Sequence, residues 1–253
     1  MSGVVFLVGA GPGAPDLLTL RAARLLGEAD IVFFDALVHP ETVALAATAE
    51  KIAVGKRCGR HSTVQQFINK RLVDAARKHA IVVRLKGGDP LLFGRAQEEI
   101  AALEAAGIRC EVVPGITAAL AAAAEVKTSL TQRGIARSVT FATPRVGTQE
   151  QPSNWASALA ATDAGAVYMG IGEAPHIAST LLAAGKPATF PVVIVENASL
   201  PNMRIQYMTL GDLQHMVDAQ ISGPGLILLG PQFTARSEIA DVDRCRPALR
   251  KAG

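Results

Sequence analysis

The chain has 253 residues, of which 49% are hydrophobic and 19% are charged, so it can fold as one large or two smaller domains and is not a generally disordered protein. Its formal net charge of +3 is too small to indicate binding of polyanions through bulk charge. Aromatic residues make up 4% of the chain, which disfavours base-stacking surfaces and suits close packing of helices on sheets.

Cysteine usage and the N-terminus lead us to expect a cytoplasmic protein without a metal. Cys58, Cys110 and Cys245 lie far apart, and an odd number of cysteines without a framework favours reduced thiols. Cys58 and His61 have a Cys-x-x-His spacing, but no second pair completes a tetrahedral site. The N-terminus lacks the basic region of a signal peptide, and no apolar run approaches the ~20 residues that span a bilayer.

The first predicted strand, Val4–Val8, leads into a loop rich in glycine and proline and then into a predicted helix over Leu17–Ala29. The loop formally matches the small-residue pattern of dinucleotide-binding proteins. However, Pro12 and Pro15 remove two of the backbone N–H groups that a pyrophosphate needs. We therefore expect an uncharged or cationic group against this loop, with a nicotinamide-dependent oxidoreductase as the alternative.

The next two predicted strands, Ile31–Asp35 and Lys51–Val54, each end in candidate site residues. Asp35 could bind a ribose, act as a catalytic carboxylate or cap a helix. The loop after the second of these strands is either an anion site or a solvated surface loop. Its three cations are Lys56, Arg57 and Arg60.

The most informative stretch is Lys86–Arg95, between a predicted buried strand, Ile81–Leu85, and a helix over Ala96–Ala106. Two adjacent glycines let the backbone approach a ligand closely. Asp89 places a carboxylate where open α/β sheets bind ligands, and the alternative is a plain structural turn.

The helix that follows this stretch has a charged face at its start. Arg95 shares that face with Glu98 and Glu99, which could also be an ordinary surface ion pair.

We expect two α/β domains: residues 1–116 with a mostly parallel sheet, and residues 117–253 with a mixed sheet. The boundary lies at the Pro-Gly turn after the fifth predicted strand, Cys110–Val113. In the second part, Val192–Glu196 and Met203–Thr209 are predicted to pair antiparallel. The other predicted elements there are strands Ser138–Thr143, Ala166–Met169 and Leu226–Leu229, and helices Asn154–Ala161, Ala174–Ala184 and Leu210–Ala219.

Taken in order, these loops resemble the tetrapyrrole methylase family from Val4 to about Gly230. The matching segments are Val8–Gly13, Asp35–Val38, Val54–Arg57, Lys86–Pro90, Phe93–Arg95, Val113–Thr117, Leu130–Arg133 and Tyr168–Gly170. The Gly-Lys-Arg and Gly-Asp-Pro…Phe-Gly-Arg motifs favour the branch that methylates uroporphyrinogen III at carbon.

The resemblance implies two α/β domains with a ligand cleft between them, a homodimer, and S-adenosyl-L-methionine as methyl donor, with S-adenosyl-L-homocysteine as product. It implies transfer of two methyl groups to uroporphyrinogen III, giving precorrin-2 in sirohaem- or cobalamin-type biosynthesis. By motif position, the donor would contact Pro12, Gly87, Gly88, Asp89, Leu92, Thr117, Ala118, Met169 and Ala198.

The same resemblance assigns chemistry to charged residues. Asp35 would accept a proton, Lys56 would donate one, and Arg95 would act electrostatically because arginine is a poor base. The residues expected to bind the tetrapyrrole are Arg57, Glu98, Arg133, Arg137 and Arg145. Pyrrole carbons are electron-rich, so neither a metal nor a covalent nucleophile is required, and we expect no nucleic-acid or membrane partner.

Two departures from the family pattern concern the second half. The family often has glycine where this chain has Ala198, and Thr143–Arg145 stands where many relatives have a Thr-Gly-His type sequence. The alternatives are a later corrin-ring methyltransferase, a methylase of a protein or RNA group, and a non-catalytic ligand sensor. Any dehydrogenase or chelatase step is expected to belong to other proteins.

Overall fold

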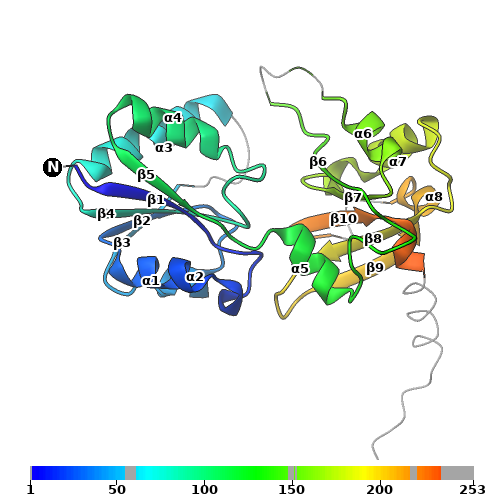
Figure 1. Cartoon of the computed structure of the whole chain (residues 1–253), viewed down its shortest axis with the longest axis horizontal. Coiled ribbons are helices and arrows are strands. Elements are labelled where there is room, and N and C mark those ends of the chain that lie inside the picture. The colour runs from blue at the N-terminus through cyan, green and yellow to red at the C-terminus, as the bar shows by residue number, and fades with distance from the viewer. Residues whose placement is uncertain (1, 55–60, 148–150, 152, 217–220, 235–253) are drawn as a thin grey trace, which may run out of the picture. The chain divides into compact units, whose positions relative to one another are not determined.

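The computed structural model of the protein describes residues 2–54, 61–147, 151, 153–216 and 221–234. The chain forms two compact units, and the division between them falls inside helix α5 (Ala118–Glu125), after Ala121. Each unit is built around its own five-stranded sheet (Figure 1). The predicted fold class, two α/β domains, is therefore confirmed.

The sheet of the first unit is parallel throughout, with the strand order β3-β2-β4-β1-β5. Its strands are β1 (Val4–Gly9), β2 (Ile31–Phe34), β3 (Glu50–Ala53), β4 (Ile81–Lys86) and β5 (Arg109–Val113). This confirms the parallel sheet predicted from continuous apolar runs, since a strand covered on both faces has both sets of alternate side chains buried.

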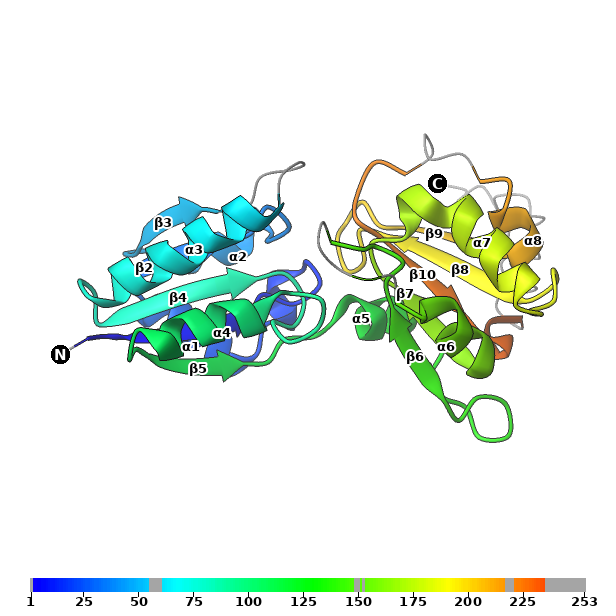
Figure 2. The same ribbon diagram turned by 90° about the horizontal axis from the view of Figure 1, so that it is seen from above.

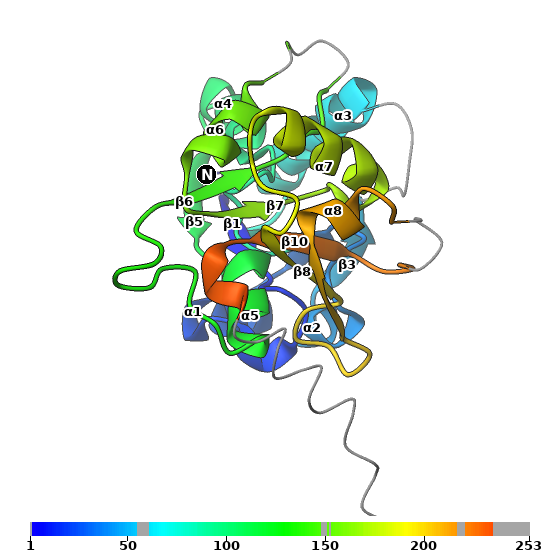
Figure 3. The same ribbon diagram turned by 90° about the vertical axis from the view of Figure 1, so that its right-hand side faces the viewer.

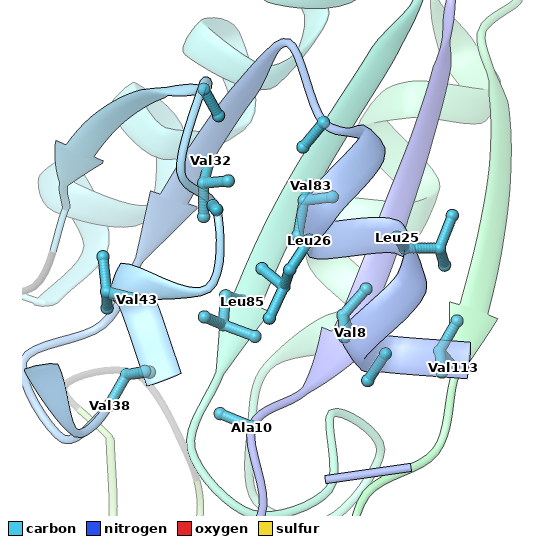
Figure 4. Close-up of a cluster of buried hydrophobic side chains, with 14 residues drawn as sticks. Val8, Ala10, Leu25, Leu26, Val32, Val38, Val43, Val83, Leu85 and Val113 are labelled. Carbon is cyan, nitrogen blue, oxygen red and sulfur yellow. The ribbon is translucent and has the colours of Figure 1, made fainter. Parts of the chain in front are cut away.

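Helices cover both faces of this sheet, as Figures 1 and 2 show. They are α1 (Leu20–Glu28), α2 (Pro40–Ala44), α3 (His61–Ala76) and α4 (Ala96–Ala105). On the side of α1 and α2, Leu26 packs in one cluster with Val83 and Leu85 (Figure 4). On the side of α3 and α4, Leu72 belongs to a cluster with Val82. Neighbouring residues of β4 thus face opposite cores.

The strand order of this sheet creates a candidate ligand-binding edge at the carboxyl ends of its central strands. Strands β1 and β4 are adjacent, but β1 continues through α1 on one face and β4 continues through α4 on the other. Their connections leave in opposite directions, so the carboxyl ends of β1 and β4 form a topological switch point. In open α/β sheets, ligands bind outside such a point, and both glycine-rich loops start here.

The sheet of the second unit is mixed, with the order β6-β7-β10-β8-β9. Its strands are β6 (Val139–Ala142), β7 (Ala164–Val167), β8 (Pro191–Glu196), β9 (Arg204–Thr209) and β10 (Gly225–Leu229). Only β6 and β7 pair parallel, and the predicted antiparallel pair of β8 and β9 is confirmed. Helices α6 (Trp155–Ala161), α7 (Ala174–Ala183) and α8 (Leu210–Leu213) pack on one face (Figure 3).

Two helices of the first unit differ from prediction. The helix expected from Leu17 begins three residues later, because Pro15–Leu17 forms a 3-10 turn and the Thr19 hydroxyl caps α1 by accepting the Ala22 N–H at 3.1 Å. The five-residue α2 is too short to show helical periodicity and was not predicted.

Two elements of the second unit also differ. Helix α8 ends at Leu213 and a turn follows at residues 214–215, so the predicted continuation to Ala219 is wrong there. Strand β7 ends at Val167, because Met169 has a φ of 55°, which strands do not adopt. In the described ranges, no helix is long and apolar enough to cross a membrane.

Candidate active site

The loops after β1, β4 and β5 pack on one another through glycine backbones. Gly88 N–H donates to Gly11 O at 2.7 Å and Gly11 N–H donates to Gly88 O at 3.2 Å, with both glycines in the left-handed region. A Cβ on Gly9 would lie 2.5 Å from Gly115 Cα, and one on Gly115 would lie 2.3 Å from Gly88 O. Real Cβ atoms do not approach backbone that closely, so these positions require glycine.

Asp89 links two of these loops with its carboxylate. Its Oδ1 accepts the Leu91 N–H at 2.8 Å, and its Oδ2 accepts the Gly115 N–H at 2.9 Å. The carboxylate therefore sets the shape of the loop after β4 and its distance from the loop after β5. A direct contact of Asp89 with the methyl donor stays a prediction.

The second half of the loop after β4, residues 90–95, has an unusual backbone conformation. Phe93 and Arg95 have φ values of 53° and 55°, and a Cβ on the intervening Gly94 would lie 2.5 Å from Pro90 O. A non-glycine residue in the left-handed region costs about 1–3 kcal/mol, and such residues cluster at functional sites. Leu91 and Phe93 are exposed here, although both are large and apolar.

A buried cluster of charges lies under this edge of the sheet. Arg84 donates to Asp35 Oδ1 through Nη2 at 2.5 Å and to Glu99 Oε1 through Nε at 3.0 Å. Lys86 Nζ donates to both oxygens of Glu99 at 3.1 and 3.2 Å, and Gln65 Nε2 donates to Glu99 at 3.2 Å. Arg84, Lys86 and Glu99 are almost fully buried, while the Asp35 side chain is 29% exposed.

Electrostatics inside this cluster follows from its burial. Burial acts to lower the pKa of the Arg84 guanidinium, but the charges of Asp35 and Glu99 outweigh it and raise that pKa. Burial, and then the neighbouring Arg84 cation, lower the pKa of the Lys86 ammonium although Glu99 opposes the shift. Two cations and two carboxylates balance, which is what an apolar interior requires of buried charges.

Arg95 and Glu98 form the ion pair expected from their spacing, with contacts of 2.7 and 2.8 Å on the exposed side of α4. The expectation that Glu99 lies on the same face as Arg95 is wrong, because Glu99 turns inward to the two buried cations of β4.

The donor residues predicted in the second half follow β7 and β8. Met169 follows β7 and is partly exposed. Ala198 is buried between Asn197 and Ser199, which have φ values of 52° and 68°. Ala198 itself is not in the left-handed region, so alanine fits without strain where relatives often have glycine.

Glu196 is the last residue of β8, and it anchors the loop that follows this strand. Its side chain is 2% exposed and accepts N–H groups from Ser222 at 2.9 Å and Gly223 at 2.7 Å, and the Nε of Arg204 at 2.6 Å. It directly precedes the segment Asn197–Ser199. Burial acts to raise the pKa of the Glu196 carboxyl, but these hydrogen bonds outweigh it and hold that pKa below 4.5.

The remaining predicted residues are less defined. Thr117 is buried and Ala118 half-buried at the start of α5, and Pro12 and Leu92 are half-buried in their loops. Arg133, Arg137 and Arg145 are exposed in loops of the second unit. Lys56 and Arg57 lie outside the described residues, as do Cys58 and Arg60.

The sequence pattern of the family described as Tetrapyrrole (Corrin/Porphyrin) Methylases matches residues 4–214 of this chain. The chain belongs to the tetrapyrrole methylase family. The resemblance inferred from the loop motifs is thus confirmed.

Solved structures of the family agree with this assignment. The uroporphyrin-III C-methyl transferase of Thermus thermophilus superimposes with a TM-score of 0.81 at 38% identity, covering 92% of this chain and 100% of that one. Its complex with S-adenyl homocysteine gives a TM-score of 0.79 at 37% identity, with the same coverage. A cobalt precorrin-4 methyltransferase gives 0.78 at 29% identity, covering 90% of this chain and 94% of that one.

The chain spans about half the length of the curated relatives it matches. The siroheme synthase of Azotobacter vinelandii is 43% identical over 240 residues, which are 94% of this chain and 52% of that protein.

The first unit of this tetrapyrrole methylase fits a ligand such as S-adenosyl-L-methionine, which carries a sulfonium cation. A Cβ on Gly88 would meet nothing closer than Thr117 Cα at 3.9 Å, so the loop leaves space beside its backbone. Pro12 and Pro15 limit the N–H donors that would favour an anion. Among the described residues, no group of His, Cys, Asp and Glu side chains could hold a metal ion.

Sequence reasoning missed the buried partners of this site, Arg84, Lys86, Glu99 and Glu196. A signal was present: Arg84 interrupts an apolar strand that is predicted to be covered on both faces, and a charge in such a strand needs a partner.

We predict that Gly115→Ala destabilises the first unit by about 1–3 kcal/mol, because the new methyl group would overlap the backbone of Gly88 and Gly9. Gly27→Ala is the matched control: its Cβ meets nothing within 4 Å inside α1, so it should stabilise by about 0.5–1 kcal/mol. Calorimetric melting of both variants measures this, and equal melting temperatures would contradict it.

We predict that Glu196→Gln lowers the free energy of unfolding by about 1.5–3 kcal/mol at neutral pH, because the amide cannot accept all the bonds that the carboxylate accepts. Folding lowers the pKa of Glu196. The stability that its carboxylate contributes is therefore fully present when the pH is above the ordinary glutamate pKa, and it is lost as the pH falls through the folded pKa. Denaturant unfolding from pH 7 to pH 3 should therefore show the two proteins converging. A gap independent of pH would contradict this role.

Proposed function

We propose that this chain is an S-adenosyl-L-methionine-dependent C-methyltransferase that adds two methyl groups in succession to uroporphyrinogen III and forms precorrin-2. The observation that carries the proposal is the glycine-packed edge at the switch point of the first sheet. It is supported by similarity over 92% of the chain to a uroporphyrin-III C-methyl transferase whose structure was solved with S-adenyl homocysteine.

The chain's own loops would hold and orient the methyl donor. When bound, the donor supplies an electrophilic methyl group on a sulfonium sulfur. Close backbone approach at Gly87 and Gly88 and the fixed carboxylate of Asp89 suit an uncharged adenosine joined to a cation. By motif position we assign the donor contacts to Pro12, Gly87, Gly88, Asp89, Leu92, Thr117, Ala118, Met169 and Ala198.

The acceptor carbon of a pyrrole is electron-rich, so the protein's tasks are alignment of the ring and removal of a proton. Asp35 is a partly exposed carboxylate at the carboxyl end of β2, and we assign it the proton acceptor role. We assign Lys56 the proton donor role and Arg95 electrostatic stabilisation.

Carboxylates on the tetrapyrrole call for cations at the site. Arginine binds carboxylates through paired hydrogen bonds, and the second unit exposes several of them in loops. The proposed substrate-binding residues are the arginines Arg57, Arg133, Arg137 and Arg145, together with Glu98, which is paired with Arg95. The proposal includes a cytoplasmic homodimer that binds no nucleic acid.

Anaerobic incubation with uroporphyrinogen III and S-adenosyl-L-methionine tests the function, with the product mass read after chromatography. We expect a gain of two methyl groups through a singly methylated intermediate. Donor binding without methylation would contradict the substrate and favour a later corrinoid, since a cobalt precorrin-4 methyltransferase shares the fold.

We predict that Asp89→Asn weakens binding of S-adenosyl-L-homocysteine about tenfold, because an amide N–H₂ would face the Leu91 or Gly115 N–H and loosen the loop. Asp212→Asn is the matched control, since Asp212 also accepts a backbone N–H, from Thr209 at 2.9 Å, but caps α8. Titration calorimetry should show the control binding as the unmodified chain does. Unchanged affinity in Asp89→Asn would rule out this loop as the donor site.

A further inference from the structure

Arg84 is a costly residue in its position. It lies in the central strand β4 with 1% of its surface exposed, in a sheet covered by helices on both faces. Replacing a buried ion pair by apolar side chains is often neutral or stabilising, so stability alone does not explain a buried arginine. Its contacts offer a functional explanation.

The guanidinium is fixed by three separate acceptors. Nε donates to Glu99, Nη2 to Asp35, and Nη1 to the Leu85 carbonyl at 3.2 Å. The same carbonyl accepts the backbone N–H of Asp35 at 3.3 Å. The backbone and the side chain of Asp35 are therefore both held against one point of β4, and the carboxylate has little freedom to rotate.

Glu99 has partners other than Arg84, whereas Asp35 is paired with Arg84. Glu99 already receives both a cation from Lys86 and a neutral hydrogen bond from Gln65, so it does not depend on Arg84 alone. Asp35 has Arg84 as its side-chain partner within the described part of the chain. Arg84 thus fixes one oxygen of Asp35 from the buried side.

Exposure differs sharply between the two partners. The Asp35 side chain is 29% exposed, whereas the Arg84 side chain is 2% exposed. The carboxylate can therefore meet a ligand at the edge of the sheet, and the arginine cannot. The direct route from Arg84 to a bound ligand is therefore through Asp35.

We propose that Arg84 is a positioning residue for methyl transfer, which holds the Asp35 carboxylate oriented to take a proton from the methylated tetrapyrrole. This rests on the proposed function. As the carbon–carbon bond to the methyl group forms, the sulfur–methyl bond breaks and its electron pair stays on sulfur. The methylated pyrrole gains a positive charge, a C–H proton of a neighbouring methylene bridge moves to the Asp35 carboxylate, and the electron pair of that C–H bond neutralises the pyrrole. Water then takes the proton from Asp35.

The test is a double-mutant cycle of Arg84→Met and Asp35→Asn on the full chain, with kcat and KM measured for uroporphyrinogen III. We expect Asp35→Asn to lower kcat about 10²–10⁴-fold and Arg84→Met about 10–100-fold, with donor KM within about twofold. The double variant should be no slower than Asp35→Asn, because both changes remove one function. Losses that multiply would overturn the inference.

A second variant, Arg84→Lys, keeps the test decisive if Arg84→Met does not fold. Arg84→Lys keeps the cation but reaches one carboxylate at a time, so we expect a folded protein with reduced kcat and unchanged affinity for S-adenosyl-L-homocysteine. If either folded Arg84 variant keeps full kcat, the inference about Arg84 is overturned and the proposed function is not. An unmodified chain that does not methylate uroporphyrinogen III overturns the proposed function, and full kcat in Asp35→Asn overturns the role of Asp35.

Discussion

The contact of glycine backbones at the ends of β1, β4 and β5 is the constraint on which the first unit depends. Gly9 and Gly115 approach each other and the Gly88 carbonyl so closely that a methyl group on either of the two would overlap the backbone. This contact brings together the loops of three parallel strands at the switch point of the sheet. With the loops in that position, Asp89 can bridge two of them through backbone hydrogen bonds. The edge is therefore preorganised by its backbone, which suits a site that aligns reactants.

The second feature of this edge is charge placed in an apolar layer. Glu99 satisfies Arg84 and Lys86 from α4, so the cost of burying them depends on the packing of that helix against β4. The same helix begins with the left-handed Arg95 and its ion pair to Glu98. The position of α4 thus links the buried cluster to the exposed loop at the site.

Much of this could be predicted from the sequence, because apolar runs and glycine positions report local structure directly. The parallel and mixed sheets followed from strand patterns, and the family followed from the order of the loop motifs. The inward turn of Glu99 could not be predicted, since helical spacing places it equally near Arg95, and its partners come from a strand that precedes the helix. The late start of α1 depended on one cap at Thr19.

Hydrogen exchange with and without S-adenosyl-L-homocysteine tests most directly the claim that the glycine-packed edge binds the methyl donor. Ligand contact should slow exchange of amides that are otherwise exposed in loops. The account predicts new protection in peptides covering residues 9–16, 86–95 and 113–118, with none in α1. Saturating ligand that leaves these three loops unprotected would contradict it.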